Sequence, residues 1–354
     1  MPSYLDQLSP DELRVLQSYS KVIVWGYPLH THTHSYIHAM WVKVFQEAFQ
    51  KDTYWFHDGE YPADFDYTNC LFIAEGFADE NIPVHDTSVY FVHKVYRPEK
   101  YVSKGARLIE MRFNVMEIHD DCNYFKLDDG THNNIVMLSD ETKYERLFDN
   151  RGIHSERRDD VIQPIEYECI YIYWATDLLP HEFDYADATR QREPIIYYVG
   201  SLSKSNNRLV FQQICQHFNI QTVCVDPWKT PISFEDNRDL MKRSLVCPDF
   251  RPIGSPKDTE KYGPKSGPNQ LENGYLPCRV LKAMSYGQLG ITDSVHVKNI
   301  LGEHVVYHPD MRQLFYLSMR DRTNEEMIVN GMKYVQERHT YVNRARDLLR
   351  ALLQ

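Results

Sequence analysis

Four histidines alternate with polar residues directly after the first apolar run of the chain. The segment HTHTHSYIH (30–38) follows KVIVWGY (21–27), a β-branched run that ends near a glycine. In an extended loop alternate residues lie on one side, so these histidines share a side until a helix begins near Ser35. A neutral histidine at such a position can act as a general base or hold a sugar. We expect His34 to be the base, with His32 as the second choice.

A metal site is another interpretation of the same loop. His-x-His after a first strand is typical of zinc hydrolases, and His34 and His38 have the i,i+4 spacing of helical zinc ligands. Such a site needs further His and Asp ligands at other strand ends, and the second half of the chain has no pattern of that kind. We therefore expect no divalent metal. A capping loop with surface histidines stays open as a third interpretation.

Other candidate bases lie at the ends of later apolar runs. Asp58, Glu75 and His93 each stand at or just past the end of such a run. A lone carboxylate at a strand end is more often a turn or cap residue than a base. These three residues are therefore the next positions to test after the histidine loop.

A long basic loop is the second notable segment. Residues 248–277 contain ten Gly or Pro in thirty positions, and loops of this length in compact domains are usually functional. Over 251–285 six Lys or Arg face three acids, a local balance of +3 in a chain of net charge −11. A basic loop that leads into a helix N-terminus suits a diphosphate. A solvated surface loop is the alternative.

The predicted helix after this loop, 278–287, has a polar and an apolar face. At 100° per residue one face is cationic and the other is wholly apolar. The apolar face is expected to pack on a sheet, and the cationic face to look into a cleft. The cationic face carries Arg279, Lys282, Ala283 and Tyr286.

Short apolar runs that alternate with helical patterns must position these residues. Strand, loop, helix and strand succeed one another in both halves, which is the pattern of an α/β fold with parallel sheets. The polar stretch 181–194 ends in proline and separates the halves, so we expect a linker between about 180 and 195. In such sheets ligands bind at the carboxyl ends of the strands. The predicted domains are 1–182 and 190–330, and 331–354 closes the chain as a helix.

Two segments carry a resemblance to a known family. CRVLKAMSYGQLGITDS (278–294) resembles the C-terminal signature of GT-B glycosyltransferases, and PIIYYVGSLSKSNNR (194–208) resembles the strand and glycine turn of their donor half. The N-terminal half is similar, more loosely, to glycosyltransferase-like proteins of viral or bacterial type. The resemblance implies two Rossmann-like domains facing a cleft. It also implies that the N-terminal domain binds the acceptor and that the last helix packs back towards that domain.

The donor in this family is a nucleotide sugar, here a UDP- or GDP-sugar, and it is a substrate, so no cofactor is required. Retaining members carry a glutamate at the position of Lys282 and another eight residues earlier, where this chain has Gly274. We therefore expect inversion, with transfer to a hydroxyl of a glycan or other acceptor. The residues expected to bind the donor are Gly200, Ser201, Lys204, Asp249, Arg251, Lys257, Tyr262, Tyr275, Leu276, Arg279 and Lys282.

Four other functions stay open on the sequence alone. They are a nucleotide-sugar epimerase of the same fold, a DNA-modifying glycosyltransferase, a histidine-rich metal-dependent hydrolase and a silent sugar-binding module. An epimerase would release an altered sugar without any acceptor. A hydrolase would retain zinc, and a silent module would bind nucleotide without turnover.

Composition limits the partners and the compartment. The 354 residues are 42% hydrophobic and 25% charged, which is ordinary for a globular protein, and the net charge of −11 argues against a polyanion such as nucleic acid. Seven cysteines without metal-ligand spacing argue against a disulfide framework. The start of the chain reads as a polar helix with Ser9 as cap and Pro10 in its first turn, not as a signal peptide. We expect a cytoplasmic protein without a membrane span.

Overall fold

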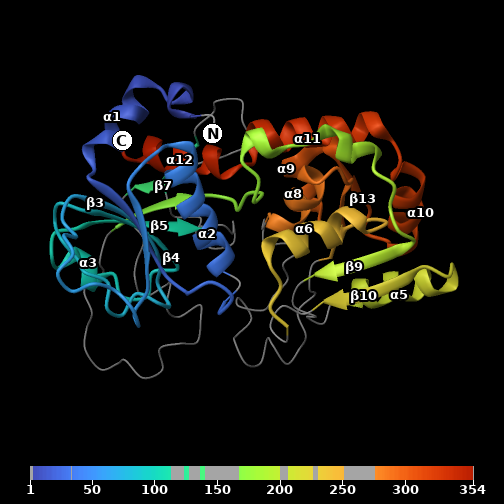
Figure 1. Cartoon of the computed structure of the whole chain (residues 1–354), viewed down its shortest axis with the longest axis horizontal. Helices are drawn as coiled ribbons and strands as arrows, with labels where there is room; N and C mark the ends of the chain where they lie inside the picture. Colours follow the sequence, from blue (N-terminus) through green and yellow to red (C-terminus); the bar gives the residue numbers. More distant parts are fainter. Residues whose placement is uncertain are drawn as a thin grey trace. The chain divides into compact units, whose positions relative to one another are not determined.

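The computed structural model describes residues 3–32, 34–112, 123–126, 136–139, 167–199, 206–225, 230–250 and 276–353. The chain is α/β, as predicted, and divides into two compact units (Figure 1). Unit 1 comprises Met1–Tyr173 and Tyr341–Gln354, and unit 2 comprises Trp174–Thr340.

Unit 1 is built on a sheet whose described strands run in the order β2-β1-β3-β4-β5-β8-β7-β6. The strands from β2 to β8 are parallel, and β7 and β6 add an antiparallel edge. The central β3 and β4 are buried over their whole length, which is typical of a parallel sheet covered on both faces. The strands are β1 (Lys21–Trp25), β2 (Thr53–Phe56), β3 (Cys70–Glu75), β4 (Val89–His93), β5 (Arg107–Arg112), β6 (Asn123–Lys126), β7 (Val136–Ser139) and β8 (Glu168–Tyr171).

Helices from both ends of the chain belong to this unit. They are α1 (Pro10–Ser18), α2 (Ser35–Lys43), α3 (Glu99–Val102) and α12 (Tyr341–Ala351). The predicted start of α1 is confirmed, because the Ser9 hydroxyl accepts the Glu12 amide and the Glu12 carboxylate accepts the Ser9 amide. The Glu12 carboxylate is buried and also accepts hydrogen bonds from Arg350 Nε at 2.7 Å and Arg346 Nε at 3.4 Å. Helix α1 is thereby fixed to α12.

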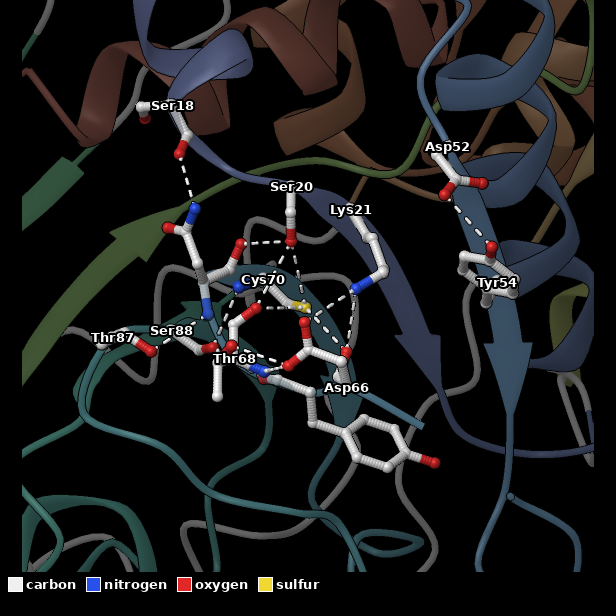
Figure 2. A network of polar contacts seen from close by, with 12 residues as sticks. Ser18, Ser20, Lys21, Asp52, Tyr54, Asp66, Thr68, Cys70, Thr87 and Ser88 are labelled. Atoms are coloured by element: carbon white, nitrogen blue, oxygen red, sulfur yellow. Dashed lines mark hydrogen bonds and ion pairs between the residues drawn. The ribbon is translucent and has the colours of Figure 1, made fainter. Parts of the chain in front are cut away.

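A polar network holds the amino ends of the central strands together (Figure 2). Lys21 Nζ at the start of β1 donates to the Asp66 carbonyl at 3.0 Å, and the Ser20 hydroxyl donates to the Asn69 carbonyl at the same distance. The Cys70 amide donates to the Ser88 hydroxyl at 2.9 Å, which links the starts of β3 and β4. Structural hydrogen bonds therefore occupy the amino ends of these strands. In such folds ligands bind at the opposite, carboxyl ends of the strands.

Unit 2 contains shorter parallel strands covered by helices. Strand β9 (Ile195–Val199) pairs with β10 (Gln221–Val225), and β12 (Gly290–Thr292) lies between β11 (Pro248–Asp249) and β13 (Val305–Tyr307). Its core combines residues of β9, β12 and several helices, such as Ile196, Ile291 and Phe315. The helices are α5 (Asn206–His217), α6 (Phe234–Arg243), α8 (Cys278–Ser285), α9 (Val295–Leu301), α10 (Met311–Asp321) and α11 (Glu325–Arg338).

The division between the units falls outside the polar stretch expected to be the linker. Residues 181–194 lie inside unit 2, where Phe183 and Tyr185 pack against its core and Ala188 is part of it. Aromatic residues spaced among polar ones anchor the stretch, and composition alone does not show this. The chain leaves unit 2 after Thr340 rather than near residue 330, so that α11 belongs to unit 2 and only α12 to unit 1.

No helix in the described ranges is long and apolar enough to cross a membrane. The cysteines whose surroundings the structure describes are free thiols, namely Cys70, Cys215, Cys224, Cys247 and Cys278.

Candidate functional site

The histidine loop leaves β1 through Gly26, which lies against the buried His38 ring. A Cβ atom on Gly26 would lie 2.1 Å from Cε1 of His38, so any larger residue there would displace this ring. The loop is then held by the buried Ser35, whose hydroxyl donates to the His32 carbonyl at 2.6 Å. His34 immediately precedes α2, and its backbone amide donates to Nδ1 of His32 at 3.1 Å. These hydrogen bonds connect His32 to His34 and to the start of α2.

The next two candidates lie at the carboxyl ends of neighbouring strands. Glu75 and His93 are the last residues of β3 and β4, and they stand directly opposite each other in the parallel register. Gly76 locks this register, because its amide donates to the His93 carbonyl at 2.9 Å and a Cβ there would lie 1.9 Å from the Lys94 carbonyl oxygen. The close backbone approach places the two side chains together.

Three side chains meet at this edge of the sheet. Nδ1 of His34 lies 2.7 Å from Oε2 of Glu75, and Nδ1 of His93 lies 2.8 Å from the same oxygen. Glu75 and His93 are 1% and 3% exposed, whereas the His34 side chain is 16% exposed. His34 is therefore the member of the cluster that a substrate can reach.

The protonation states follow from burial and hydrogen bonding. Burial raises the pKa of Glu75, but the two histidines more than offset this and hold it well below its ordinary value, so the carboxylate is ionised. Burial lowers the pKa of His93 to about 4, which keeps this ring neutral. An ionised carboxylate only accepts hydrogen bonds, so Nδ1 of both rings carries the proton. In a neutral His34 ring with this bond, the lone pair is on Nε2, the atom that can take a proton from a hydroxyl.

His32 borders the cluster without entering the hydrogen bonds to Glu75 that the structure describes. Its ring stacks on Tyr27 with centroids 4.1 Å apart and stands edge-on to His34 at 4.8 Å. Burial lowers the pKa of His32, and the neighbouring His34 lowers it further. Tyr27 is itself held protonated, because burial and the charge of Glu75 raise its pKa to about 12. His32 and Tyr27 thus form a neutral wall beside His34.

Asp58, the remaining predicted base, is held by hydrogen bonds from neighbouring loops. Its Oδ1 accepts hydrogen bonds from Trp25 Nε1 at 3.0 Å and from the Asn81 amide at 2.9 Å, and its Oδ2 accepts the Glu80 amide at 2.8 Å. These bonds tie the ends of β1 and β2 to the loop after β3. The Asp58 carboxylate therefore has a structural role in the turn, which is the more common role of an acid at a strand end.

The cluster also has the composition of a metal site. His34, Glu75 and His93 each offer one ligand atom, and these atoms lie within 4.8 Å of one another. Ligand atoms around a tetrahedral zinc ion are separated by about 3.3 Å, given bond lengths near 2.0–2.1 Å. The N–O separations of 2.7 and 2.8 Å are shorter and match hydrogen bonds. In the structure, Glu75 is therefore hydrogen-bonded to both histidines.

In unit 2 the predicted donor helix begins as expected at Cys278. The Arg279 guanidinium donates through Nη2 to the Val199 carbonyl at 2.7 Å, which places it at the carboxyl end of β9. Asp249 lies at the carboxyl end of β11, and the buried Leu276 lies two residues before the helix, which Pro277 precedes. The other residues expected to bind the donor lie outside the described residues, namely Gly200, Ser201, Lys204, Arg251, Lys257, Tyr262 and Tyr275.

Only part of the predicted cationic face of this helix is accessible, because its second half is buried. Ala283 and Tyr286 are fully buried, and the Tyr286 hydroxyl donates to Oδ1 of Asp177 at 2.5 Å. Lys282 Nζ lies 3.6 Å from Oδ2 of the same carboxylate. Burial lowers the pKa of Lys282, but Asp177 outweighs this and raises it, so the ammonium is retained as an ion-pair partner. The expectation that this face looks into a cleft was wrong for the second half of the helix, because Asp177, more than 100 residues earlier in the sequence, packs against it.

The sequence did not indicate several residues that contact the predicted donor helix and the neighbouring strand ends. Asp177 is one of them, because its partners Lys282 and Tyr286 lie far from it in the sequence. Asn207 donates to Oδ2 of Asp293 at 2.7 Å and so links the start of α5 to the turn after β12, a pairing that only the fold reveals.

The chain matches no protein-family model and no curated protein.

His38 makes the stability of this region depend on pH. Burial lowers its pKa from 6.5 to about 4, so the folded protein binds a proton less readily than the unfolded chain. Stability from the neutral ring is complete above pH 6.5 and is lost as the pH falls towards 4. We expect the wild-type free energy of unfolding to lose about 2 kcal/mol from this residue between pH 7 and pH 5. Denaturant unfolding of His38→Gln should show a correspondingly weaker pH dependence, and an unchanged dependence would contradict this assignment.

Proposed function

We propose that the protein is a glycosyltransferase of the GT-B type, which moves a sugar from a UDP- or GDP-sugar to a hydroxyl acceptor with inversion. The observation that carries this proposal is the hydrogen bond from His34 Nδ1 to the buried, ionised Glu75. A carboxylate that orients a histidine and stabilises its protonated form is the arrangement of a general base. The parallel strands and covering helices of both units support two Rossmann-like domains.

The chemical step follows from this arrangement. Nε2 of His34 takes the proton of the acceptor hydroxyl while the oxygen attacks the anomeric carbon from the face opposite the diphosphate. The bond between the anomeric carbon and the diphosphate oxygen breaks, and the nucleoside diphosphate leaves with the electron pair. Glu75 stabilises the imidazolium, which afterwards releases its proton to solvent. His93 holds the other side of Glu75 and keeps the carboxylate in place.

The donor half of the proposal centres on Arg279. A guanidinium has five N–H donors, and its bond to the Val199 carbonyl uses one of them and fixes the group at a strand end. The first turn of α8 adds backbone amides that suit a diphosphate. We propose that the diphosphate lies here and that the strand ends of β9 and β11 hold the rest of the nucleotide.

A panel of UDP-, GDP-, dTDP- and CMP-sugars in a thermal-shift assay tests the donor. Only the cognate donor should raise the melting temperature, because a ligand stabilises the state that binds it. Arg279→Ala should weaken its affinity at least tenfold, since hydrogen bonds to charged groups contribute about 1.5–3 kcal/mol. Arg312→Ala, an exposed arginine of α10, is the matched control. Equal affinity in wild type and Arg279→Ala would refute the diphosphate position.

A metal-dependent hydrolase is the second candidate, favoured by the three ligand atoms within 4.8 Å. The two candidates differ in what the purified protein retains. The transferase needs no divalent ion at this cluster, so dialysis against a chelator should leave transfer unchanged. Stoichiometric zinc that survives purification, with activity lost on chelation, would favour the hydrolase.

A further inference from the structure

One oxygen of the Glu75 carboxylate takes no part in the hydrogen bonds to the histidines. Oε2 accepts from His34 and His93, whereas Oε1 is buried and has no hydrogen-bond partner among the residues that the structure describes. The Glu75 side chain is only 1% exposed. Buried carboxylate oxygens normally have partners, because an uncompensated buried charge is costly. An oxygen of this kind beside two imidazoles points to a cation as its partner.

The three side chains form a ligand set for a divalent transition metal. His34, Glu75 and His93 each offer one atom, and these atoms lie within 4.8 Å of one another. Two imidazole nitrogens and a carboxylate oxygen suit Zn²⁺, whereas Mg²⁺ and Ca²⁺ prefer oxygen ligands alone. Three protein ligands leave a fourth position around the ion that a water molecule fills.

Zinc fits the cluster after a small adjustment. Ligand atoms of tetrahedral zinc lie about 3.3 Å apart, so the N–O distances of 2.7 and 2.8 Å must each lengthen by about 0.5–0.6 Å. A side-chain rotation of about 10° moves an imidazole atom this far and stays within a rotamer well. The His34 side chain is 16% exposed, so solvent reaches the cluster on its side.

We infer that Zn²⁺ binds to His34, His93 and Glu75 and reversibly inhibits the protein; the inhibition, unlike the binding, rests on the proposed function. Zinc takes the lone pair of Nδ1 on His34, so the Nδ1 proton leaves to solvent and the neutral ring carries a proton from solvent on Nε2. The ring keeps its charge, but Nε2–H can only donate. It cannot take the proton of the acceptor hydroxyl, so bound zinc and the base reaction exclude each other. A hydrolase would instead use the ion to activate water.

Calorimetry with zinc chloride on the chelator-treated full chain tests the site without any sugar. We expect one zinc ion per chain and no binding of Mg²⁺. His34→Gln and His93→Gln should each weaken zinc binding at least about 100-fold, beyond the loss that an outer-shell partner typically causes. His57→Gln is the matched control, because His57 lies 3.6 Å from the exposed Glu60 in a histidine–glutamate pair outside the cluster. It should bind zinc as the wild type does.

Absorption of the Co²⁺-loaded wild type gives a readout that does not depend on the folding of the buried His93→Gln variant. Tetrahedral coordination by nitrogen and oxygen should give d–d bands, and these should disappear in His34→Gln, whose substitution lies in a partly exposed loop. Absence of saturable zinc binding to the wild type would overturn the site. Binding that both His34→Gln and His93→Gln leave unchanged would overturn it as well.

Transfer kinetics separate the inhibition from the proposed function. Zinc should inhibit transfer by the wild type and by His57→Gln in proportion to its occupancy, and a chelator should restore the full rate. Transfer at an unchanged rate with zinc bound would overturn the inhibition. Activity that requires zinc would overturn it too and would favour the hydrolase. Zinc binding that depends on His34 in a protein without transfer activity would refute the proposed function and leave the metal site standing.

Discussion

His34→Ala is expected to lower the rate of sugar transfer by about 10²–10⁴ while nucleotide binding stays intact. The size of the effect is that of a lost general base. His34 is the partly exposed member of its cluster, and its Nδ1–H bond to Glu75 directs the Nε2 lone pair away from the carboxylate. In the proposed reaction His34 becomes an imidazolium beside a carboxylate 2.7 Å away, and the alanine variant removes both the oriented base and this ion pair.

Single-turnover transfer and separate calorimetry of nucleotide binding distinguish lost chemistry from lost folding. His32→Ala is the matched control, because it removes a neighbouring histidine that makes no described bond to Glu75. It should lower the rate much less than His34→Ala. Near-normal turnover in both variants would mean that the base lies elsewhere, and Glu75 and His93 would be tested next.

Gly76→Ala is expected to lower the free energy of unfolding by about 3 kcal/mol and to reduce transfer together with stability. The added Cβ would meet the Lys94 carbonyl oxygen at 1.9 Å, and a backbone atom within two packed strands cannot rotate away. Relief requires the ends of β3 and β4 to separate. Such a separation would pull Glu75 from His93, since these residues are direct register partners.

Denaturant unfolding measures the first effect, and transfer assayed well below the unfolding transition measures the second. Gly59→Ala is the control, because a Cβ there meets only the His57 side chain, at 3.3 Å, and a side chain can move. Its stability should change by less than about 0.5 kcal/mol. A Gly76→Ala variant as stable as Gly59→Ala would show that the two strands are not clamped in this way.

Much of unit 1 could be predicted from local patterns. The run KVIVWGY (21–27) forms β1 and ends within two residues of its expected limit, and Glu75 and His93 end β3 and β4 as expected. The capping box of Ser9 and Glu12 is likewise a local signal. Glu75 and His93 were recognisable as strand-end residues, and His34 as part of the loop after the first strand. Their meeting was not, because it depends on the order β1-β3-β4 and on the register between Glu75 and His93.

The errors share a physical cause. Asp58 and Glu75 give the same signal in the sequence, yet amides of a distant loop occupy one carboxylate and two histidines occupy the other. Helical periodicity predicted that Lys282 lies on an exposed polar face, but in the fold its ammonium lies 3.6 Å from the buried Asp177 carboxylate. Which partner reaches a strand end or a helix face is decided by tertiary packing. The donor-binding residues outside the described ranges stay predictions.

The return of the chain to unit 1 through α12 constrains the order of events during synthesis. Unit 2 is continuous in sequence, and its entry and exit lie side by side, since the Thr176 amide donates to the His339 carbonyl at 3.0 Å. It can therefore complete its folding as soon as residue 340 has left the ribosome. Unit 1 cannot, because the buried Glu12 meets Arg346 and Arg350 only after all of unit 2 has been made. Until then the first unit lacks the helix that packs on α1 and α2, and a chain that waits in this state is exposed to chaperones and to aggregation.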